Sequence, residues 1–193
     1  MKRNQYTLGK PISFKGNGLH SGIPVTITMR PAPAGSGIIF RRIDLTGAPE
    51  VPAKSEFVTN TLRATTLERG DAKVFTVEHI LSALFALRID NCILEMDAPE
   101  PPVADGGALT FSQMILEAGI VELEEQTDIL TLEMSVAVYE DNKFITALPY
   151  DGLRITFTSI NPHPLLGTQM KDFTIDKETY IREIAPSRTI GFT

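Results

Sequence analysis

The sequence predicts an α+β protein made of two similar segments. Three observations carry this prediction: several short runs alternate apolar and polar residues, two longer runs repeat their apolar residues at helical spacing, and a strand–turn–strand pattern occurs in both halves. The chain has 193 residues, of which 42% are hydrophobic and 22% are charged, so it can bury a sizeable core.

Strands dominate the first part of the chain. Apolar residues alternate around Tyr6 and Leu8, around Ile12 and Phe14, and from Val25 to Met29. The turns "GNGLHSG" (16–22) and "PAPAGSG" (31–37) flank the third of these runs, and "IIFRRIDL" (38–45) follows as a further strand.

Two helices and a buried strand come next. The run "VFTVEHILSALFALRI" predicts a helix over 76–88, with Thr76 as its N-cap and with Val77, Ile80, Leu84 and Leu87 on one apolar face. "NCILEMDAP" (91–99) is apolar on both faces and predicts a buried strand. "LTFSQMILEAG" (109–119) predicts a second helix that ends at Gly119.

The last third repeats part of the first. Residues 121–128 are rich in charge and predict a linker, after which "ILTLEMSVAVYE", "KFITALPY" and "LRITFTSI" predict strands. "KFITALPYDGLRITFTSINP" is similar to "VTITMRPAPAGSGIIFRRIDL", and "PSRTIGF" is loosely similar to "TLRATTL". We therefore expect a first domain over 1–120, a linker over 121–128 and a second domain over 129–193.

The second domain is expected to be incomplete. The first copy of the pattern continues through two helices, whereas the second copy stops at Thr193 without them. A sheet without its helices leaves an apolar face uncovered. Self-association through that face is the expected consequence.

Charge and composition exclude several classes of protein. The net charge of −6 and the lack of a basic tract argue against nucleic acid as the partner. The one cysteine, Cys92, excludes an internal disulfide and lies in an apolar run that indicates burial. No stretch has the length of a membrane span, and the N-terminus lacks the apolar region of a signal peptide, so we expect a cytoplasmic protein.

Glu78 and His79 stand side by side at the start of the first helix. The helix macrodipole favours a carboxylate there and disfavours a protonated histidine, so His79 is expected to be neutral, as a metal ligand must be. A metal ligand beside a general base is one interpretation, and a capping glutamate beside a hydrogen-bonded histidine is the other. The zinc pattern HExxH is absent, His20 lies in a loop that offers a side chain or is simply a tight turn, and His163 lies between two prolines.

Taken in order, the motifs resemble a known enzyme family. "GNGLHSG", "RPAP", "RRIDL", "TVEHILSAL", "IDNCILEMDAPEPPVADGGA" and "SRTIGF" together resemble the zinc-dependent UDP-3-O-acyl-N-acetylglucosamine deacetylases of lipid A synthesis. The resemblance implies two domains of similar topology, each layering a small mixed sheet against helices, with the active site between them. It also implies zinc as cofactor and a UDP-linked acyl glucosamine as substrate.

The resemblance assigns roles to individual residues. His79 matches a zinc ligand, Glu78 matches the proposed general base, and Thr189 matches a threonine that stabilises the oxyanion. Substrate contacts are implied for four residues: Leu62 and Arg63 of an inserted lid, His20 near the cleft, and Ile190, which replaces a phenylalanine of the family.

Other parts of the family pattern lie beyond the sequence. The remaining zinc ligands, in an "HKxxD"-type helix, and the histidine that completes the acid–base chemistry are not matched within the 193 residues. We therefore expect a truncated chain that is inactive alone. The alternative is a non-catalytic module of the same fold that binds a nucleotide sugar or a protein.

Overall fold

Alternation of apolar and polar side chains builds the central sheet. The computed structural model describes residues 2–189. In β3 (Pro24–Pro31), Val25, Ile27 and Met29 are buried, whereas the residues between them are partly exposed. The predicted period of two is thus confirmed, and it directs one face of the strand into the core.

The central sheet is mixed and has five strands. Their order is β2-β3-β9-β4-β5, in which β4 and β9 run parallel and the other neighbours run antiparallel. The strands are β2 (Ile12–Asn17), β3, β9 (Cys92–Met96), β4 (Ile38–Arg42) and β5 (Glu50–Pro52). A separate three-stranded sheet contains β6 (Val58–Asn60), β7 (Thr66–Arg69) and β8 (Ala72–Phe75).

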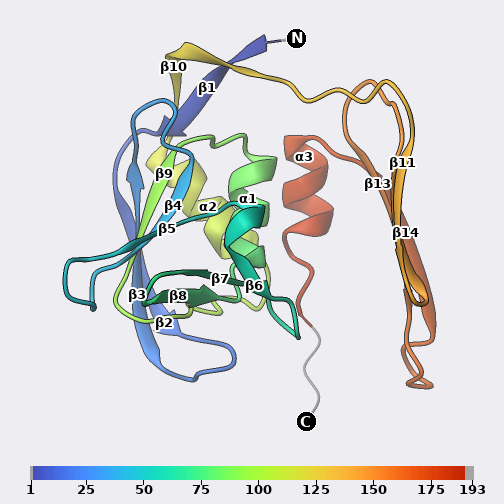
Figure 1. Cartoon of the computed structure of the whole chain (residues 1–193), viewed down its shortest axis with the longest axis horizontal. Coiled ribbons are helices and arrows are strands. Elements are labelled where there is room, and N and C mark those ends of the chain that lie inside the picture. The colour runs from blue at the N-terminus through green and yellow to red at the C-terminus, as the bar shows by residue number, and fades with distance from the viewer. Residues whose placement is uncertain (1, 190–193) are drawn as a thin grey trace.

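Two helices cover one face of the central sheet (Figure 1). In α1 (Glu78–Ala86) and its flanks, Val77, Ile80, Leu84 and Leu87 are at most 3% exposed, which confirms the predicted apolar face. α2 (Leu109–Ala118) ends at Gly119 as predicted, and the positive φ of 78° there is one that glycine adopts readily. The α+β class is confirmed.

The predicted start of α1 is wrong. Thr76 has a φ of 58° and its hydroxyl donates to Glu100, so it does not cap the helix, which begins at Glu78. Tertiary contact with Glu100 overrides the local capping preference of threonine. The short strands β5 to β8 were not predicted either, because three or four residues give too few periods to reveal alternation.

The segment predicted as a charged linker is a strand. β10 (Ile120–Asp128) pairs antiparallel with β1 (Lys2–Leu8). Its charged side chains are compatible with this pairing because they lie at an exposed surface, where Glu122 accepts hydrogen bonds from Tyr6 and Asn4. The linker prediction was therefore wrong about conformation, and the division into domains stays a prediction.

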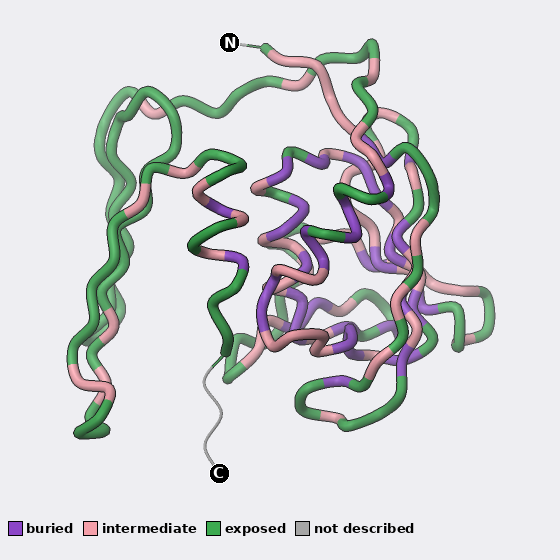
Figure 2. The backbone as a smooth tube through the Cα atoms, turned by 180° about the vertical axis from the view of Figure 1, so that it is seen from behind, coloured by how far each residue is buried: buried purple, intermediate pink, exposed green. Residues whose placement is uncertain are grey.

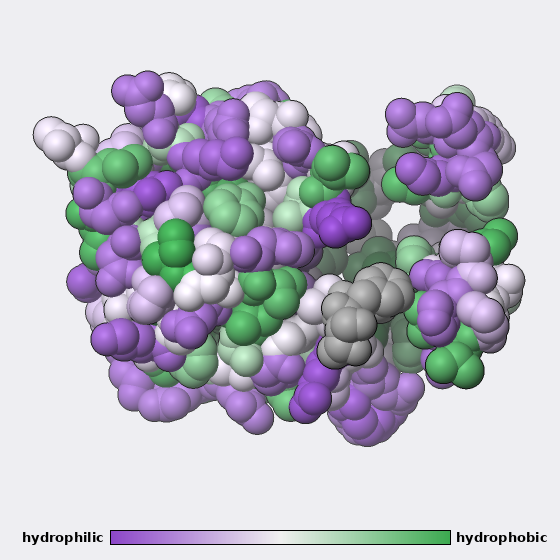
Figure 3. All heavy atoms as spheres, turned by 90° about the horizontal axis from the view of Figure 1, so that it is seen from below, coloured by the Kyte–Doolittle hydropathy of each residue, from purple (hydrophilic) through white to green (hydrophobic). Residues whose placement is uncertain are grey.

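Four later strands form a layer that stands away from the main body, which we call the hairpin panel (Figure 1). It consists of the hairpins β11 (Val136–Glu140) with β12 (Lys143–Ala147), and β13 (Arg154–Ile160) with β14 (Thr168–Thr174). Nearly all of its residues are exposed (Figure 2). A space-filling view shows an opening between the panel and the main body (Figure 3).

The chain returns from the panel to the main body through a short helical segment. α3 (Lys177–Thr179) begins with Asp176, whose side chain accepts from the Thr179 amide, and continues as a π-helical turn over Tyr180–Ile184. Tyr180 and Ala185 are buried in the core that also contains α1 and α2. Among residues 2–189, none of the helices combines the length and hydropathy needed to cross a bilayer.

Candidate active site

Glu78 and His79 occupy the first turn of α1, where the chain leaves β8. Both side chains are partly exposed. Within residues 2–189 the structure gives the His79 imidazole no hydrogen-bond partner, so its nitrogen lone pair is available to a ligand. Of the two interpretations of the sequence, the hydrogen-bonded histidine is not the arrangement seen.

The Glu78 carboxylate is tied to the neighbouring loop. Its Oε2 accepts a hydrogen bond from the Thr65 backbone N–H at 3.1 Å. Thr65 ends the loop 61–65, which also contains Leu62, 81% exposed, and Arg63, with a φ of 62°. The residue bonded to Glu78 thus follows Arg63 by two positions and Leu62 by three in the same loop.

Thr189 lies on a segment that is fastened to the loop before α2. Its backbone N–H donates to the Gly106 carbonyl at 2.8 Å, and the Ala108 N–H donates to the Ala185 carbonyl at 3.0 Å. Asp105 in the same loop accepts a hydrogen bond from the Thr110 amide at the start of α2. The Thr189 side chain is exposed, and Ile190 lies outside the described residues.

His20 is presented by a tight loop that closes on a buried carboxylate. Glu100, 1% exposed, accepts hydrogen bonds from the His20 and Ser21 amides and from the Thr76 hydroxyl. Burial by itself raises the pKa of Glu100, but these hydrogen bonds outweigh it and lower the pKa below its ordinary value. Sequence reasoning missed Glu100. A charged residue between Pro99 and Pro101, beside a buried apolar strand, was the one available indication.

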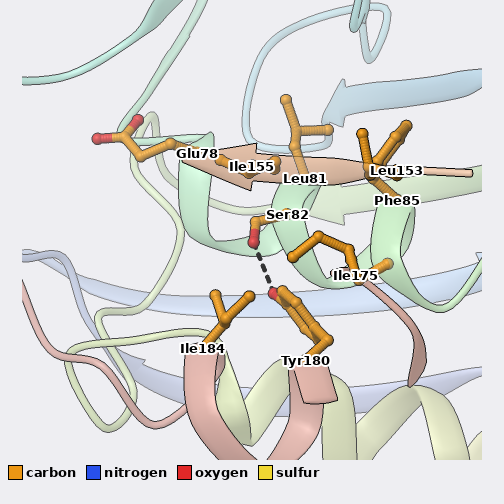
Figure 4. A pocket seen from close by; sticks show the side chains of 10 residues that line it. Glu78, Leu81, Ser82, Phe85, Leu153, Ile155, Ile175, Tyr180 and Ile184 are labelled. Atoms are coloured by element: carbon orange, nitrogen blue, oxygen red, sulfur yellow. Dashed lines mark hydrogen bonds between the residues drawn. The ribbon is translucent and has the colours of Figure 1, made fainter. Parts of the chain in front are cut away.

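A cavity of about 360 Å³ separates α1 from the hairpin panel (Figure 4). Its walls are mainly apolar, and Phe85, Ile155 and Ile184 are among the residues that line it. Glu78 lies at its edge with the carboxylate pointing away from the other labelled side chains. Among the lining residues, the hydroxyls of Ser82 and Tyr180 are joined by a hydrogen bond of 2.6 Å, which links α1 to the helical turn 180–184.

The residues described do not form a complete zinc site. Zinc in a catalytic centre takes about three protein ligands. Within residues 2–189 no group of three histidine, cysteine, aspartate or glutamate side chains is placed to hold a metal ion. His79 supplies one nitrogen donor of the kind that zinc prefers. Cys92 is no candidate, because burial raises its pKa to about 12 and keeps the thiol protonated.

Comparison with known proteins gives a consistent result along the chain. A family described as "LpxC: UDP-3-O-acyl N-acetylglycosamine deacetylase" matches residues 5–193. The chain is 44% identical over 192 residues to the "Bifunctional enzyme LpxC/FabZ" of Chlorobaculum tepidum, which covers 98% of this chain and 41% of that protein. It is 42% identical over 190 residues to a UDP-3-O-acyl-N-acetylglucosamine deacetylase of Legionella pneumophila, covering 97% of this chain and 62% of the relative. A deacetylase of the same name from Myxococcus xanthus is 42% identical over 189 residues, covering 98% and 60%. The chain thus spans 41–62% of the length of these relatives.

Proposed function

The chain belongs to the UDP-3-O-acyl N-acetylglycosamine deacetylase family, and from this membership we propose that it forms part of an enzyme that hydrolyses the N-acetyl group of UDP-3-O-acyl-N-acetylglucosamine. The proposed setting is lipid A synthesis in the cytoplasm. The observation that supports it best is the start of α1, where a carboxylate held by a backbone amide stands beside an imidazole without a hydrogen-bond partner among the described residues.

Glu78 is the proposed general base. A carboxylate can take a proton from water as that water attacks an amide carbonyl, provided that it is held in a fixed place. The hydrogen bond from the Thr65 amide supplies that constraint and leaves the second carboxylate oxygen, Oε1, for the water. The partly exposed position of Glu78 permits both water and substrate to reach it.

Thr189 is the proposed donor to the oxyanion. Its backbone is held by the Gly106 carbonyl, while its side chain is exposed. A hydroxyl held in this way can donate a hydrogen bond to the oxygen that gains charge when water adds to the acetamide. This hydrogen bond would be stronger in the transition state, where the acetamide oxygen carries negative charge, than in the bound substrate.

Zinc is the proposed cofactor, with His79 as one ligand. The support is the family resemblance, together with the His79 imidazole, which has no hydrogen-bond partner among residues 2–189. Residues 2–189 hold no group of three side chains that could bind a metal ion. The roles proposed for Glu78 and Thr189 therefore rest on these residues alone and not on bound zinc.

Leu62, Arg63, His20 and Ile190 are the proposed substrate contacts. The guanidinium of Arg63 suits the diphosphate of a UDP-linked substrate, because it offers several N–H donors in one plane. Leu62 offers an exposed apolar surface in the same loop. The proposal for Ile190 rests on the family resemblance alone.

A deacetylation assay on a chain of the relatives' length tests the proposal. Glu78→Gln keeps the shape of the side chain but removes its ability to take a proton, so hydrolysis should fall by roughly 100-fold or more. Glu117→Gln, an exposed glutamate on α2, is the matched control and should leave the rate unchanged. Binding of the UDP-sugar without hydrolysis, in a chain that is long enough to match the relatives, would instead support the non-catalytic module.

We further propose that the 193 residues alone neither turn over substrate nor bind zinc tightly. The support is the single nitrogen donor found near Glu78 where about three are needed. Calorimetric titration with zinc, beside a chain of the relatives' length, tests this. Sub-micromolar zinc binding with equal turnover by the 193 residues would show that the proposal is wrong.

A further inference from the structure

The candidate active site depends on three separate stretches of chain that meet at one buried side chain. These stretches are the His20 loop, the residues just before α1 and the segment after β9. They are distant in the sequence, so only non-covalent contacts can fix their relative positions. All three come together at Glu100, which is 1% exposed.

The two oxygens of the Glu100 carboxylate share the His20 amide and each accept one further bond. The His20 amide donates to Oε1 at 3.0 Å and to Oε2 at 3.2 Å. Oε1 also accepts from the Thr76 hydroxyl at 2.8 Å, and Oε2 accepts from the Ser21 amide at 2.8 Å. One oxygen atom therefore lies within hydrogen-bond distance of both the loop that presents His20 and the residue that precedes Val77 and Glu78.

Two backbone features show that the surroundings are shaped around this carboxylate. Thr76 is β-branched yet has a φ of 58°, a conformation that such residues rarely adopt unless tertiary contacts hold them there. Gly18 lies so close that a Cβ atom at this position would overlap the Glu100 carboxylate and the Ser21 hydroxyl. The loop can thus close on Glu100 only because residue 18 is a glycine.

We infer that Glu100 is a positioning residue of the candidate active site: its carboxylate fixes the His20 loop to the start of α1 and so sets where His20 lies relative to Glu78 and His79. The expected effect on catalysis rests on the proposed function. The expected effect on the position of the His20 loop does not. A carboxylate suits this place because the His20 and Ser21 backbone amides can only donate, and a glutamine at position 100 would offer them one acceptor oxygen instead of two.

The first test is kinetic and uses a chain of the relatives' length, because the 193 residues alone are proposed to be inactive. Glu100→Gln should lower kcat for deacetylation roughly tenfold or more, because small displacements of a catalytic group have large effects on rate. Gly18→Ala should have a similar effect, since it displaces the carboxylate without altering it. Thr76→Val should lower kcat as well, and should add little to Glu100→Gln, because both changes break the same link.

Asp90→Asn is the matched control. Asp90 is also a carboxylate with several donors, from the Arg3 guanidinium and the Tyr6 amide, but it lies past the other end of α1. Its replacement should lower the melting temperature while kcat stays within about twofold of the unaltered protein. If Glu100→Gln lowers the melting temperature but keeps kcat, as Asp90→Asn does, Glu100 is only structural and the inference is overturned.

The second test does not need activity and separates this inference from the proposed function. The imidazole resonances of His79 are recorded by NMR in the unaltered chain and in each variant. Glu100→Gln and Gly18→Ala should shift them, although both residues are distant from His79 in the sequence, while Asp90→Asn should not. Unchanged His79 resonances in Glu100→Gln would overturn the inference even if the chain has no deacetylase activity, and shifted resonances would support it in that same case.

Discussion

The Thr65 backbone N–H and the Glu78 carboxylate are joined by a hydrogen bond of 3.1 Å. This contact connects the exposed loop 61–65 to the first turn of α1, so the loop cannot move without changing the surroundings of Glu78. If the loop moves when it contacts substrate, the hydrogen bond to the proposed base Glu78 changes as well.

Arg63 allows the role of this loop to be separated from its stability. Its φ of 62° is costly for any residue with a Cβ, whereas glycine adopts it freely. Arg63→Gly should therefore keep the free energy of unfolding within about 1 kcal/mol of the unaltered protein, because backbone relief offsets the flexibility of glycine. If Arg63 contacts the substrate diphosphate, KM should rise about tenfold.

Ala48→Gly is the control for that experiment. Ala48 has a φ of 44° in the turn between β4 and β5, so glycine relieves the same kind of backbone conformation there. Its KM should not change. An unchanged KM in Arg63→Gly would remove Arg63 from the substrate contacts.

The hydrogen bond between Ser82 and Tyr180 should stabilise the packing of α1 against the helical turn 180–184. The two hydroxyls are 2.6 Å apart, and Tyr180 is 3% exposed. Tyr180→Phe should lower the free energy of unfolding by about 1 kcal/mol, because it leaves the Ser82 hydroxyl without this partner. Urea denaturation of both single variants and of Ser82→Ala with Tyr180→Phe should give a coupling energy of roughly 0.5–1.5 kcal/mol. A coupling energy near zero would mean that the contact contributes nothing.

Local pattern was sufficient for the elements that are long and one-sided. α2 with its terminal Gly119, the apolar face of α1 and the alternation in β3 follow from spacing alone. β10 could not be found in this way, because its pairing with β1 joins residues about 120 positions apart and its charged residues face solvent. A run of charged residues indicates exposure to solvent. Linkers and edge strands are both exposed, so charge alone does not distinguish them.

The candidate site could be predicted from the sequence only at residues that belong to a local motif. Glu78 and His79 are adjacent in the sequence, and the helix that presents them could be recognised. Glu100 was not, because its importance comes from donors 24 and about 80 residues away, Thr76, His20 and Ser21. A buried carboxylate is recognised by its partners, and partners distant in sequence leave no local pattern.

Glu100 should also make stability depend on pH. Its pKa is lower in the folded protein than the ordinary value of 4.5, so the ionised carboxylate stabilises the fold above that value, and this contribution is lost as the pH falls through the folded pKa. Glu100→Gln lacks the contribution at every pH. The difference in unfolding free energy between the two proteins should therefore narrow between about pH 7 and about pH 3. Urea titrations at both pH values measure it, and a constant difference would contradict the prediction.

Thr189 should act through its hydroxyl and not through its shape. Thr189→Val keeps the size of the side chain and the backbone bond to Gly106 but removes the proposed donor, so kcat should fall roughly 100-fold with little change in KM. Thr189→Ser retains a hydroxyl and should keep most of the activity. Equal losses in both variants would indicate that the methyl group matters for packing and that the hydroxyl is no oxyanion donor.

The hairpin panel should cause the 193-residue chain to associate with copies of itself. Several of its large apolar side chains are more than half exposed, among them Val138, Phe144, Ile145, Phe157 and Ile160. Exposed apolar side chains are removed from water when two such surfaces meet, and free hairpin edges add unpaired backbone groups. Sedimentation velocity at increasing concentration should show species larger than the monomer.

Charged substitutions identify the surface responsible. Ile145→Lys combined with Phe157→Lys should shift the association to higher concentration, because each places a charge where an apolar contact would form. Ile43→Lys is the control, since Ile43 is 50% exposed but lies after β4 on the main body. If Ile43→Lys weakens association as much as the panel variant, contact does not occur through the panel. A chain that stays monomeric at every concentration would show that the exposed face of these hairpins does not bind a second copy.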